Sequence, residues 1–468
     1  MTLIIILILV LGYLLIATAH ATGVNRAAIA VFICTVGWVV YVCWGHDFVM
    51  AQHPHEYSEF LNGELPSSDA VKRYIYNDIF LYYVGRAASI VMFLLATMSI
   101  IEILNNNGCF DFITEWIRTR NSKRLLWTIT LATFVISANL DNLTTTTMML
   151  VIMHSIVQNR RQRMLIGTAI VLAANCGGCF TVIGVPMGLI LWGDGAVTAT
   201  RFSGYLALPV LVAWIVPTIL INRQLPSKLD LVWAAAPYRG DDTNLNRWQR
   251  VIMLFVGIGG LWCIPTFHNI TKLSPFLGAL CVLCVLWVIN EAFNRKLNDS
   301  DQMAQRRILR AIQYGTIQQI LFVMGIMLGM GVVTETGVMG EISAWIDYNI
   351  HSVWVLGIVS GLLSGLVDTF TIAMTDVSLY PVIESTQLTQ WADSDYLANF
   401  TQNGTYWMII AYATAVGGCL LCIGSTSGLA LMKMEHMRLW WYFKNLTPKV
   451  LVGALLGLLI LWVETTAF

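Results

Sequence analysis

Charged residues are scarce in this sequence. They make up 12% of its 468 residues and cancel to a net charge of zero, while 57% of the residues are hydrophobic and 17 are Trp. A soluble domain carries about 25% charged residues, so this composition excludes an ordinary soluble globule. The sequence therefore predicts an all-α polytopic membrane protein.

Motifs of soluble catalysis are missing as well. The sequence contains no phosphate loop, no dinucleotide fingerprint and no nucleophile elbow, so nothing in it suggests ATP-driven pumping or an enzyme. No Lys or Arg precedes the first apolar run, and a secretory signal needs such a charge. We therefore interpret this run as a membrane helix.

Apolar windows recur along the whole chain. Crossing a bilayer takes roughly 20 apolar residues. The sequence predicts spans near 2–19, 27–45, 79–104, 165–193, 204–221, 251–266, 275–292, 316–333, 405–432 and 450–466. Two further apolar stretches, 125–157 and 352–383, are polar in the middle and do not fit a simple crossing.

The basic residues predict the orientation of the chain. With the N-terminus outside, 22 of the 27 Lys and Arg residues, Arg26 among them, fall in the inside segments 20–26, 105–124, 158–164, 222–250, 294–315 and 433–449. The stretch 125–157 then has both ends inside, and 352–383 has both ends outside. We therefore expect two re-entrant hairpins that open to opposite faces.

Each expected hairpin is followed by a similar span. The letters GGC, three residues and IG occur in "NCGGCFTVIG" and again in "VGGCLLCIG", which predicts an inverted repeat with two broken transmembrane helices. Ordinary close helix packing is the alternative explanation for such small residues. We expect four units. Residues 1–78 form an N-terminal two-helix segment with an outer loop, and 79–221 form the first repeat, with hairpin 125–157 and broken helix 165–193. Residues 222–315 form a two-span linker, and 316–468 form the second repeat, with hairpin 352–383, broken helix 405–432 and the last span.

Polar side chains gather in these hairpins and broken spans. Hard oxygen ligands suit a small hard cation, and a buried carboxylate can exchange a proton for it. The alternative is that the two Asp residues only cap hairpin helices and that the two Glu residues reach the membrane interface. The candidates for ion and proton binding are Asp141, Asn142, Asn139, Thr144, Asn175, Thr181, Asp368, Thr369, Thr371, Ser425, Thr426 and Ser427, with Glu102 and Glu335 as accessory acids.

Cysteine and histidine offer a weaker signal. Three Cys pairs have CxxC spacing, at 176/179, 281/284 and 419/422, and His46, His53 and His55 share an outer loop. Small thiols commonly fill tightly packed interiors, so we expect no redox centre, no cofactor and no resident metal.

Several segments together resemble one family. "SANLDNLTTTT", "AANCGGCFTVIG" and "AYATAVGGCLLCIGSTSGLALM" are similar to the NhaD-type sodium/proton antiporters, within the ion transporter superfamily that also holds arsenite and dicarboxylate carriers. The resemblance covers nearly the whole chain. It implies a multi-pass protein of the bacterial cell (inner) membrane that exchanges sodium or lithium for protons, with Asp141 as the main carrier.

The sequence departs from the family pattern in two places. An Asp usually follows the Ile-Gly of the first broken span, and here Val185 takes that place; the second hairpin usually reads VDN, and here Asp368 is followed by Thr369. Two alternatives therefore stay open: a carrier of organic anions or oxyanions, and a non-transporting sensor or structural subunit. The expected partners are small inorganic ions and membrane lipid, without nucleic acid, in a monomer or a homodimer.

Overall fold

The computed structural model describes residues 2–62, 65–110, 112–113, 117, 119, 121–227, 245–294, 299–384 and 394–467, with the helix path alone for 299–316. The regular elements in these ranges are helices. Six of the basic residues used to predict the orientation lie outside the described residues: Arg118, Arg120, Lys228, Arg239, Arg295 and Lys296.

The predicted membrane architecture is confirmed. Within the described residues, eight helices are long and apolar enough to span a membrane, or nine if one bent pair counts as a span. The eight are α1 (Thr2–Thr22), α2 (Arg26–Cys43), a continuous helix from Ser68 to Asn106, α10 (Arg160–Phe180), α12 (Ala199–Asn222), α16 (Pro275–Phe293), the Ile317–Glu335 part of α17 (Asp299–Glu335) and α25 (Thr447–Ala467).

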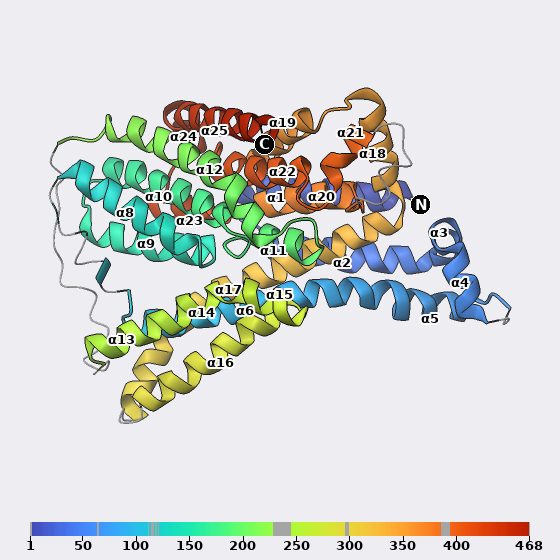
Figure 1. Ribbon diagram of the computed structural model, residues 1–468, viewed down its shortest axis with the longest axis horizontal. Helices are drawn as coiled ribbons and strands as arrows, with labels where there is room; N and C mark the ends of the chain where they lie inside the picture. Colours follow the sequence, from blue (N-terminus) through green and yellow to red (C-terminus); the bar gives the residue numbers. More distant parts are fainter. Residues whose placement is uncertain are drawn as a thin grey trace.

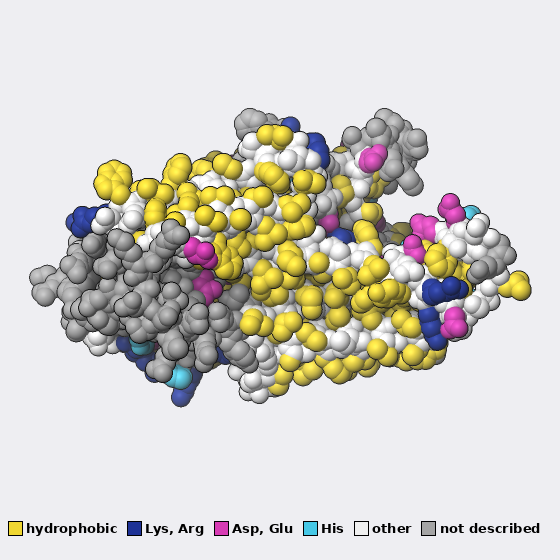
Figure 2. Space-filling model, turned by 90° about the horizontal axis from the view of Figure 1, so that it is seen from below, with side chains coloured by type: hydrophobic (Ala, Val, Ile, Leu, Met, Phe, Trp, Pro, Cys, Tyr) yellow, Lys and Arg dark blue, Asp and Glu magenta, His cyan; other side chains and the backbone are white. Residues whose placement is uncertain are grey.

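These helices lie side by side along the long axis of the molecule (Figure 1). The α10 span is central, with 83% of its apolar window buried, whereas α16 and α25 are peripheral, with 17% and 22% buried. Hydrophobic side chains cover the middle of the face in Figure 2, and charged side chains gather toward its two ends, among them the end that carries α3 to α5. This distribution is what a bilayer requires, since apolar atoms face lipid and charges face water.

Two expected spans have a different form. The window 79–104 belongs to a 39-residue helix made of α5 (Ser68–Tyr74), a π-helical turn (Ile75–Phe80) and α6 (Leu81–Asn106). The window 251–266 was expected as one span, and there the chain bends by 44° between Trp262 and α15 (Ile264–Thr271). Pro265 lies in the first turn of α15, where its missing N–H allows the preceding helix to stop.

The segment between α2 and Ser68 and the two polar-centred stretches also have regular structure. The loop before Ser68 contains two short helices, and each polar-centred stretch is a pair of helices of 11 to 16 residues. Since roughly 20 residues are needed to cross, none of these four helices is a full span. The short helices are α3 (Gly45–Gln52), α4 (Pro54–Leu61), α8 (Ser122–Ser137), α9 (Asn142–Ile156), α19 (Val353–Leu366) and α20 (Thr369–Leu379).

The helices that follow the two pairs are interrupted. After α10 the chain leaves helical geometry until α11 (Pro186–Gly193), and after α22 (Thr405–Gly417) a 3-10 turn at Cys422–Gly424 precedes α23 (Thr426–Glu435). The remaining described helices are α13 (Arg247–Leu254), a π-helical turn (Phe255–Gly259), α14 (Gly260–Trp262), α18 (Val338–Asn349), α21 (Ser394–Leu397), a 3-10 turn (Ala398–Phe400) and α24 (Leu439–Asn445).

Candidate functional site

The tip of the first helix pair is built around Asp141. Its side chain caps α9 by accepting hydrogen bonds from the backbone N–H groups of Leu143 and Thr144, both at 3.1 Å. The Thr144 hydroxyl donates to the same Oδ2 at 3.4 Å. Asp141 is only 4% exposed, so this carboxylate lies inside the protein.

The tip of the second helix pair repeats this arrangement. Asp368 Oδ2 accepts hydrogen bonds from the N–H groups of Phe370 and Thr371, at 3.0 and 3.2 Å, and from the Thr371 hydroxyl at 3.3 Å. Asp368 is 1% exposed. The capping alternative thus accounts for one oxygen of each Asp and leaves the partner of the second oxygen to be explained.

Contacts between each tip and its interrupted span also correspond. Ser137 Oγ donates to the carbonyl of Ala174, and Ser364 Oγ donates to the carbonyl of Thr414, both at 2.7 Å. Ser364 follows Ser137 by 227 residues, as Asp368 follows Asp141, and Thr414 follows Ala174 by 240. Two separate parts of the chain therefore make the same contacts, with the tips offset by 227 residues and the interrupted spans by 240.

Glycines permit the close approach of these elements. A side chain at Gly177 would overlap the backbone of Phe134, and one at Gly417 would overlap the backbone of Gly361. Both pairs keep the 227- and 240-residue spacings. The GGC letters in the two spans are therefore explained by helix packing, and the packing is repeated.

Three of the predicted hydroxyls, in the interrupted spans and the second tip, bind backbone groups. Thr181 donates to the Ala138 carbonyl, and Thr369 donates to the Gly424 carbonyl at 2.9 Å. Ser425 caps α23 by accepting from the Gly428 N–H at 3.0 Å. Ser427 is fully buried, and its Oγ has no hydrogen-bond partner among the described residues. Thr426 begins α23 beside it.

Asn175 joins the two halves. Its Oδ1 accepts from Asn142 Nδ2 at 2.8 Å, and its Nδ2 donates to Cys419 Sγ at 3.0 Å. Asn142 belongs to the first tip, and Cys419 follows α22 in the second half. The predicted residues Asp141, Asn142, Thr144 and Asn175 therefore lie together, next to the second interrupted span.

Two residues that the sequence analysis did not select complete the tips. Asp141 Oδ1 accepts a 2.8 Å hydrogen bond from Gln319 Nε2 on α17. Asp368 Oδ1 forms a buried salt bridge with Arg26 Nη1 on α2, at 3.1 Å. Arg26 was counted as an inside loop charge, and this was wrong: its side chain is buried against the second tip. The sequence signal for these two residues was their position: Arg26 and Gln319 each place a polar side chain near the end of an apolar window.

Three predicted residues lie in other surroundings. The Asn139 amide donates to the Val135 carbonyl at 2.8 Å, and its oxygen accepts from the indole of Trp262. Glu335 contacts His53, between α3 and α4, at 2.8 Å and Tyr83 of α6 at 2.7 Å. Glu102 is half-buried on α6, and its Oε1 has no partner among the described residues. These three side chains therefore face groups other than the tip carboxylates.

Asp376 is a further buried carboxylate that the sequence analysis did not select. It lies on α20, 5% exposed, and its Oδ1 accepts a hydrogen bond from Ser360 at 2.9 Å. Its Oδ2 has no partner within the described part of the chain. An acid on the buried face of a short apolar helix was the signal for it.

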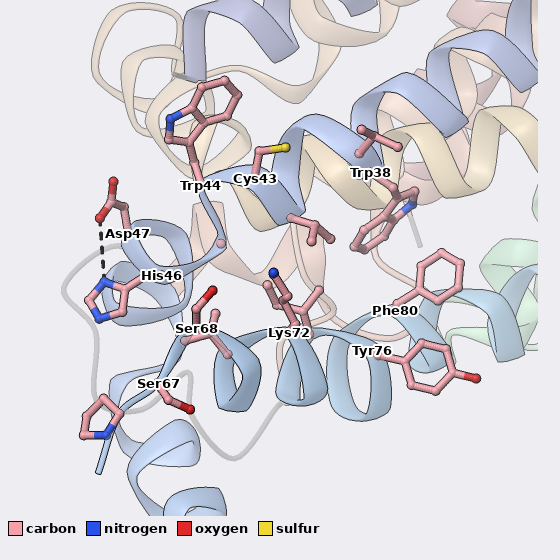
Figure 3. Close-up of a pocket in the computed structure, with 16 residues that line it drawn as sticks. Trp38, Cys43, Trp44, His46, Asp47, Ser67, Ser68, Lys72, Tyr76 and Phe80 are labelled. Atoms are coloured by element: carbon pink, nitrogen blue, oxygen red, sulfur yellow. Dashed lines mark ion pairs between the residues drawn. The ribbon is translucent and has the colours of Figure 1, made fainter.

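A cavity of about 1000 Å³ lies elsewhere, between α2 and the α5 end of the long helix (Figure 3). Trp38, Trp44 and Lys72 line it, with His46 and Asp47 paired at 3.7 Å. Neither tip carboxylate borders this cavity. The polar tips, with their carboxylate, carboxamide and hydroxyl oxygens, remain the arrangement suited to a small hard cation.

Comparisons of the sequence point to transport proteins. Residues 13–398 match the family described as citrate transporter (CitMHS). The chain is 30% identical to "Sodium/proton antiporter 1" of Arabidopsis thaliana over 382 residues, which are 80% of this chain and 61% of that protein. It is 26% identical to "Na(+)/H(+) antiporter NhaD" of Vibrio cholerae over 403 residues, 80% of this chain and 77% of that one. The chain thus spans less than two thirds of the Arabidopsis protein.

Solved structures of two transporters share the fold. The YdaH transporter of Alcanivorax borkumensis superposes with a TM-score of 0.54 at 13% identity, over 95% of this chain and 99% of that one. MtrF of Neisseria gonorrhoeae superposes with a TM-score of 0.52 at 10% identity, over 92% and 94%. With the family match over most of its length, this chain belongs to the CitMHS citrate transporter family, a family of multi-pass membrane transporters.

Proposed function

We propose that this protein is a secondary active transporter that exchanges sodium or lithium for protons across the bacterial cell membrane, with Asp141 as the carrier carboxylate. The names of the Arabidopsis and Vibrio relatives support the proposal. So does the chemistry of the first tip, which offers oxygen ligands in a buried position.

The second oxygen of Asp141 carries this proposal. It accepts a hydrogen bond from the neutral carboxamide of Gln319, and Asp141 is 4% exposed. Burying a carboxylate without an opposite charge is costly. Asp141 therefore favours binding either a proton or a small cation, and taking up one in exchange for the other is the elementary step of antiport.

The proposed route to alternating access uses both helix pairs. We place the N-terminus outside, the first hairpin open to the inside and the second hairpin open to the outside, so that the two repeats have inverted topology. The repeated contacts at spacings of 227 and 240 residues support a common origin of the two halves. Rocking of such repeats against each other would expose one site to each side in turn.

Inverted membrane vesicles test the assignment. Respiration acidifies their lumen, and addition of sodium or lithium to vesicles with the wild-type protein should dissipate the pH gradient, whereas potassium or choline should not. Asp141→Asn should remove the response, because a carboxamide neither carries a proton nor balances a cation. If Asp141→Asn vesicles respond to sodium like wild type, Asp141 is not the carrier.

Transport of an organic anion is the second candidate, since the matched family is described as citrate transporter. The helices α9 and α20 already bind the carboxylates of Asp141 and Asp368 at their N-termini, which leaves fewer free amides for an anion. Purified protein should therefore be stabilised by sodium rather than by citrate alone. Uptake of labelled citrate into proteoliposomes without sodium antiport would favour this second candidate.

A further inference from the structure

The two tip carboxylates have partners of different charge. Asp141 Oδ1 meets the neutral Gln319, whereas Asp368 Oδ1 meets the cationic Arg26. The capping oxygens of the two acids are otherwise held alike. Within the described part of the chain, a positively charged group is therefore built into one tip and not into the other.

Arg26 binds more than the carboxylate. Its Nη2 donates to the carbonyl of Ile423 at 2.7 Å and to the carbonyl of Val367 at 3.4 Å. The guanidinium thus lies among three oxygens, from the hairpin tip and from the 3-10 turn of the interrupted span. Carboxylate and carbonyl oxygens of this kind are the usual ligands of a hard cation.

The spacing of the repeat identifies the matching oxygens in the first half. Leu140 precedes Val367 by 227 residues, as Asp141 precedes Asp368, and Ile183 precedes Ile423 by 240. Among the described residues, the carbonyls of Leu140 and Ile183 accept no hydrogen bond. The oxygens that bind a guanidinium in the second half therefore have counterparts in the first half that bind no charged side chain.

We propose that the Arg26 guanidinium is a resident cation of the second tip, occupying the position that a free monovalent cation takes beside Asp141 in the first. The second tip then has a fixed charge balance, and one exchangeable cation position remains, at Asp141. The exchange at Asp141 rests on the proposed antiport; the role of Arg26 does not.

Removal of the guanidinium tests this role. Purified Arg26→Ala should melt at a lower temperature than wild type, because Asp368 loses its counter-charge. Millimolar guanidinium chloride should recover roughly half or more of the loss, saturably, by refilling the position. Choline chloride at equal concentration should recover none, and wild type should gain nothing from guanidinium. Recovery no greater with guanidinium than with choline overturns the proposal.

Sodium provides the second arm. Arg26→Ala should be stabilised by sodium more than wild type, because the second tip becomes open to a free cation. Arg163→Ala is the matched control: Arg163 binds Glu435 at 2.9 Å and the carbonyls of Val157 and Gln158, away from the tips. Its response to sodium should equal that of wild type. An equal gain in both variants contradicts a site at the second tip.

Two measurements remain decisive if Arg26→Ala fails to accumulate. The variant Arg26→Gln with Asp368→Asn removes both charges, and should accumulate and melt near wild type without any response to guanidinium; failure of this double variant overturns the pairing. Labelled sodium should bind wild type with a stoichiometry of one, and a stoichiometry of two overturns the proposal. If wild type binds no sodium, the antiport proposal fails, while the double variant still decides the role of Arg26.

Discussion

The two buried aspartates of the helix tips have different surroundings in this protein. Asp141 and Asp368 both cap a short helix with one oxygen, and the residue at the other oxygen separates them: Gln319 in one tip, Arg26 in the other. A buried ion pair has no net charge, whereas an ionised carboxylate beside a carboxamide is a buried charge without a counter-charge. The two acids should therefore respond differently to the same substitution.

Neutralising each acid in turn tests this difference. Asp141→Asn should lower sodium-dependent proton exchange about tenfold or more and leave thermal stability near wild type, since Asn caps helices about as well as Asp. Asp368→Asn should cost about 3–5 kcal/mol, because it leaves Arg26 buried without a counter-charge. Melting temperature and vesicle assays measure both effects. Equal stability losses would contradict the distinction.

A lysine beside Asp141 should give the first tip an ion pair like the one between Arg26 and Asp368 in the second tip. Gln319→Lys places an ammonium group next to Asp141 Oδ1, so the variant should fold and lose its stabilisation by sodium. Gln318→Lys makes the same charge change one residue earlier, at a half-buried position, and should keep the sodium response. Melting curves in sodium and in choline measure both. A sodium response in Gln319→Lys would show that the cation binds elsewhere.

The interrupted spans depend on glycine at the helix contacts. A methyl group at Gly417 would meet the backbone of Gly361, which cannot rotate away as a side chain can. Gly417→Ala should therefore destabilise the protein by about 1–3 kcal/mol. Gly204→Ala on α12 has open space around it and should be neutral or stabilising by about 0.5–1 kcal/mol. Thermal melting distinguishes them, and similar melting points would contradict this account of the packing.

His53, between α3 and α4, connects these two helices to the end of α17. Its ring nitrogens contact Glu56 at 2.6 Å and Glu335 at 2.8 Å, while Tyr74 and Tyr83 donate to these two acids. Burial disfavours the charged ring, but the hydrogen bonds and charges of Glu335 and Glu56 outweigh it and raise the pKa of His53. The stabilisation should be complete below the usual His value of about 6.5 and disappear as pH rises through the raised pKa.

His53→Gln should therefore lower the melting temperature at pH 6, and the difference from wild type should shrink toward alkaline pH. His55→Gln changes an exposed histidine on α4 and should have little effect at either pH. A pH-independent loss in His53→Gln would mean that the charge of the ring is unimportant.

The sequence predicted the elements better than their partners. Polar tips inside apolar stretches identified both helix pairs, because an acid or a run of threonines is costly in lipid unless protein surrounds it. The Arg26–Asp368 pair joins residues 342 positions apart, and no local pattern encodes a contact of that kind. The bend after Trp262 was not predicted, since a hydropathy window averages over Pro265 in the first turn of α15.

At the scale of the whole molecule, elements in or next to the two helix pairs lie toward opposite ends. The labels α8, α9 and α10 lie toward one end of Figure 1, and α18 and α21 toward the other. At the first end, His154 of α9 and Arg163 of α10 both contact Glu435 at the end of α23, at 2.9 Å. At the second end, Tyr380 and Tyr396 donate to Asp347 of α18, at 2.7 and 2.8 Å. The proposed inverted topology predicts that these ends face opposite sides of the membrane.

Cysteine labelling tests this orientation directly. With the exposed native cysteines 43, 263, 281 and 284 replaced by serine, Gln158→Cys and Asn349→Cys each provide one exposed thiol, beside the first and the second helix pair. A membrane-impermeant thiol reagent added to intact cells should label Asn349→Cys alone, and inverted vesicles should label Gln158→Cys alone. Labelling of both from one side would contradict the inverted repeat, because both hairpins would then open to that side. The reverse pattern would keep the inversion and place the N-terminus inside, so that the hairpin with the exchangeable Asp141 site would open to the outside.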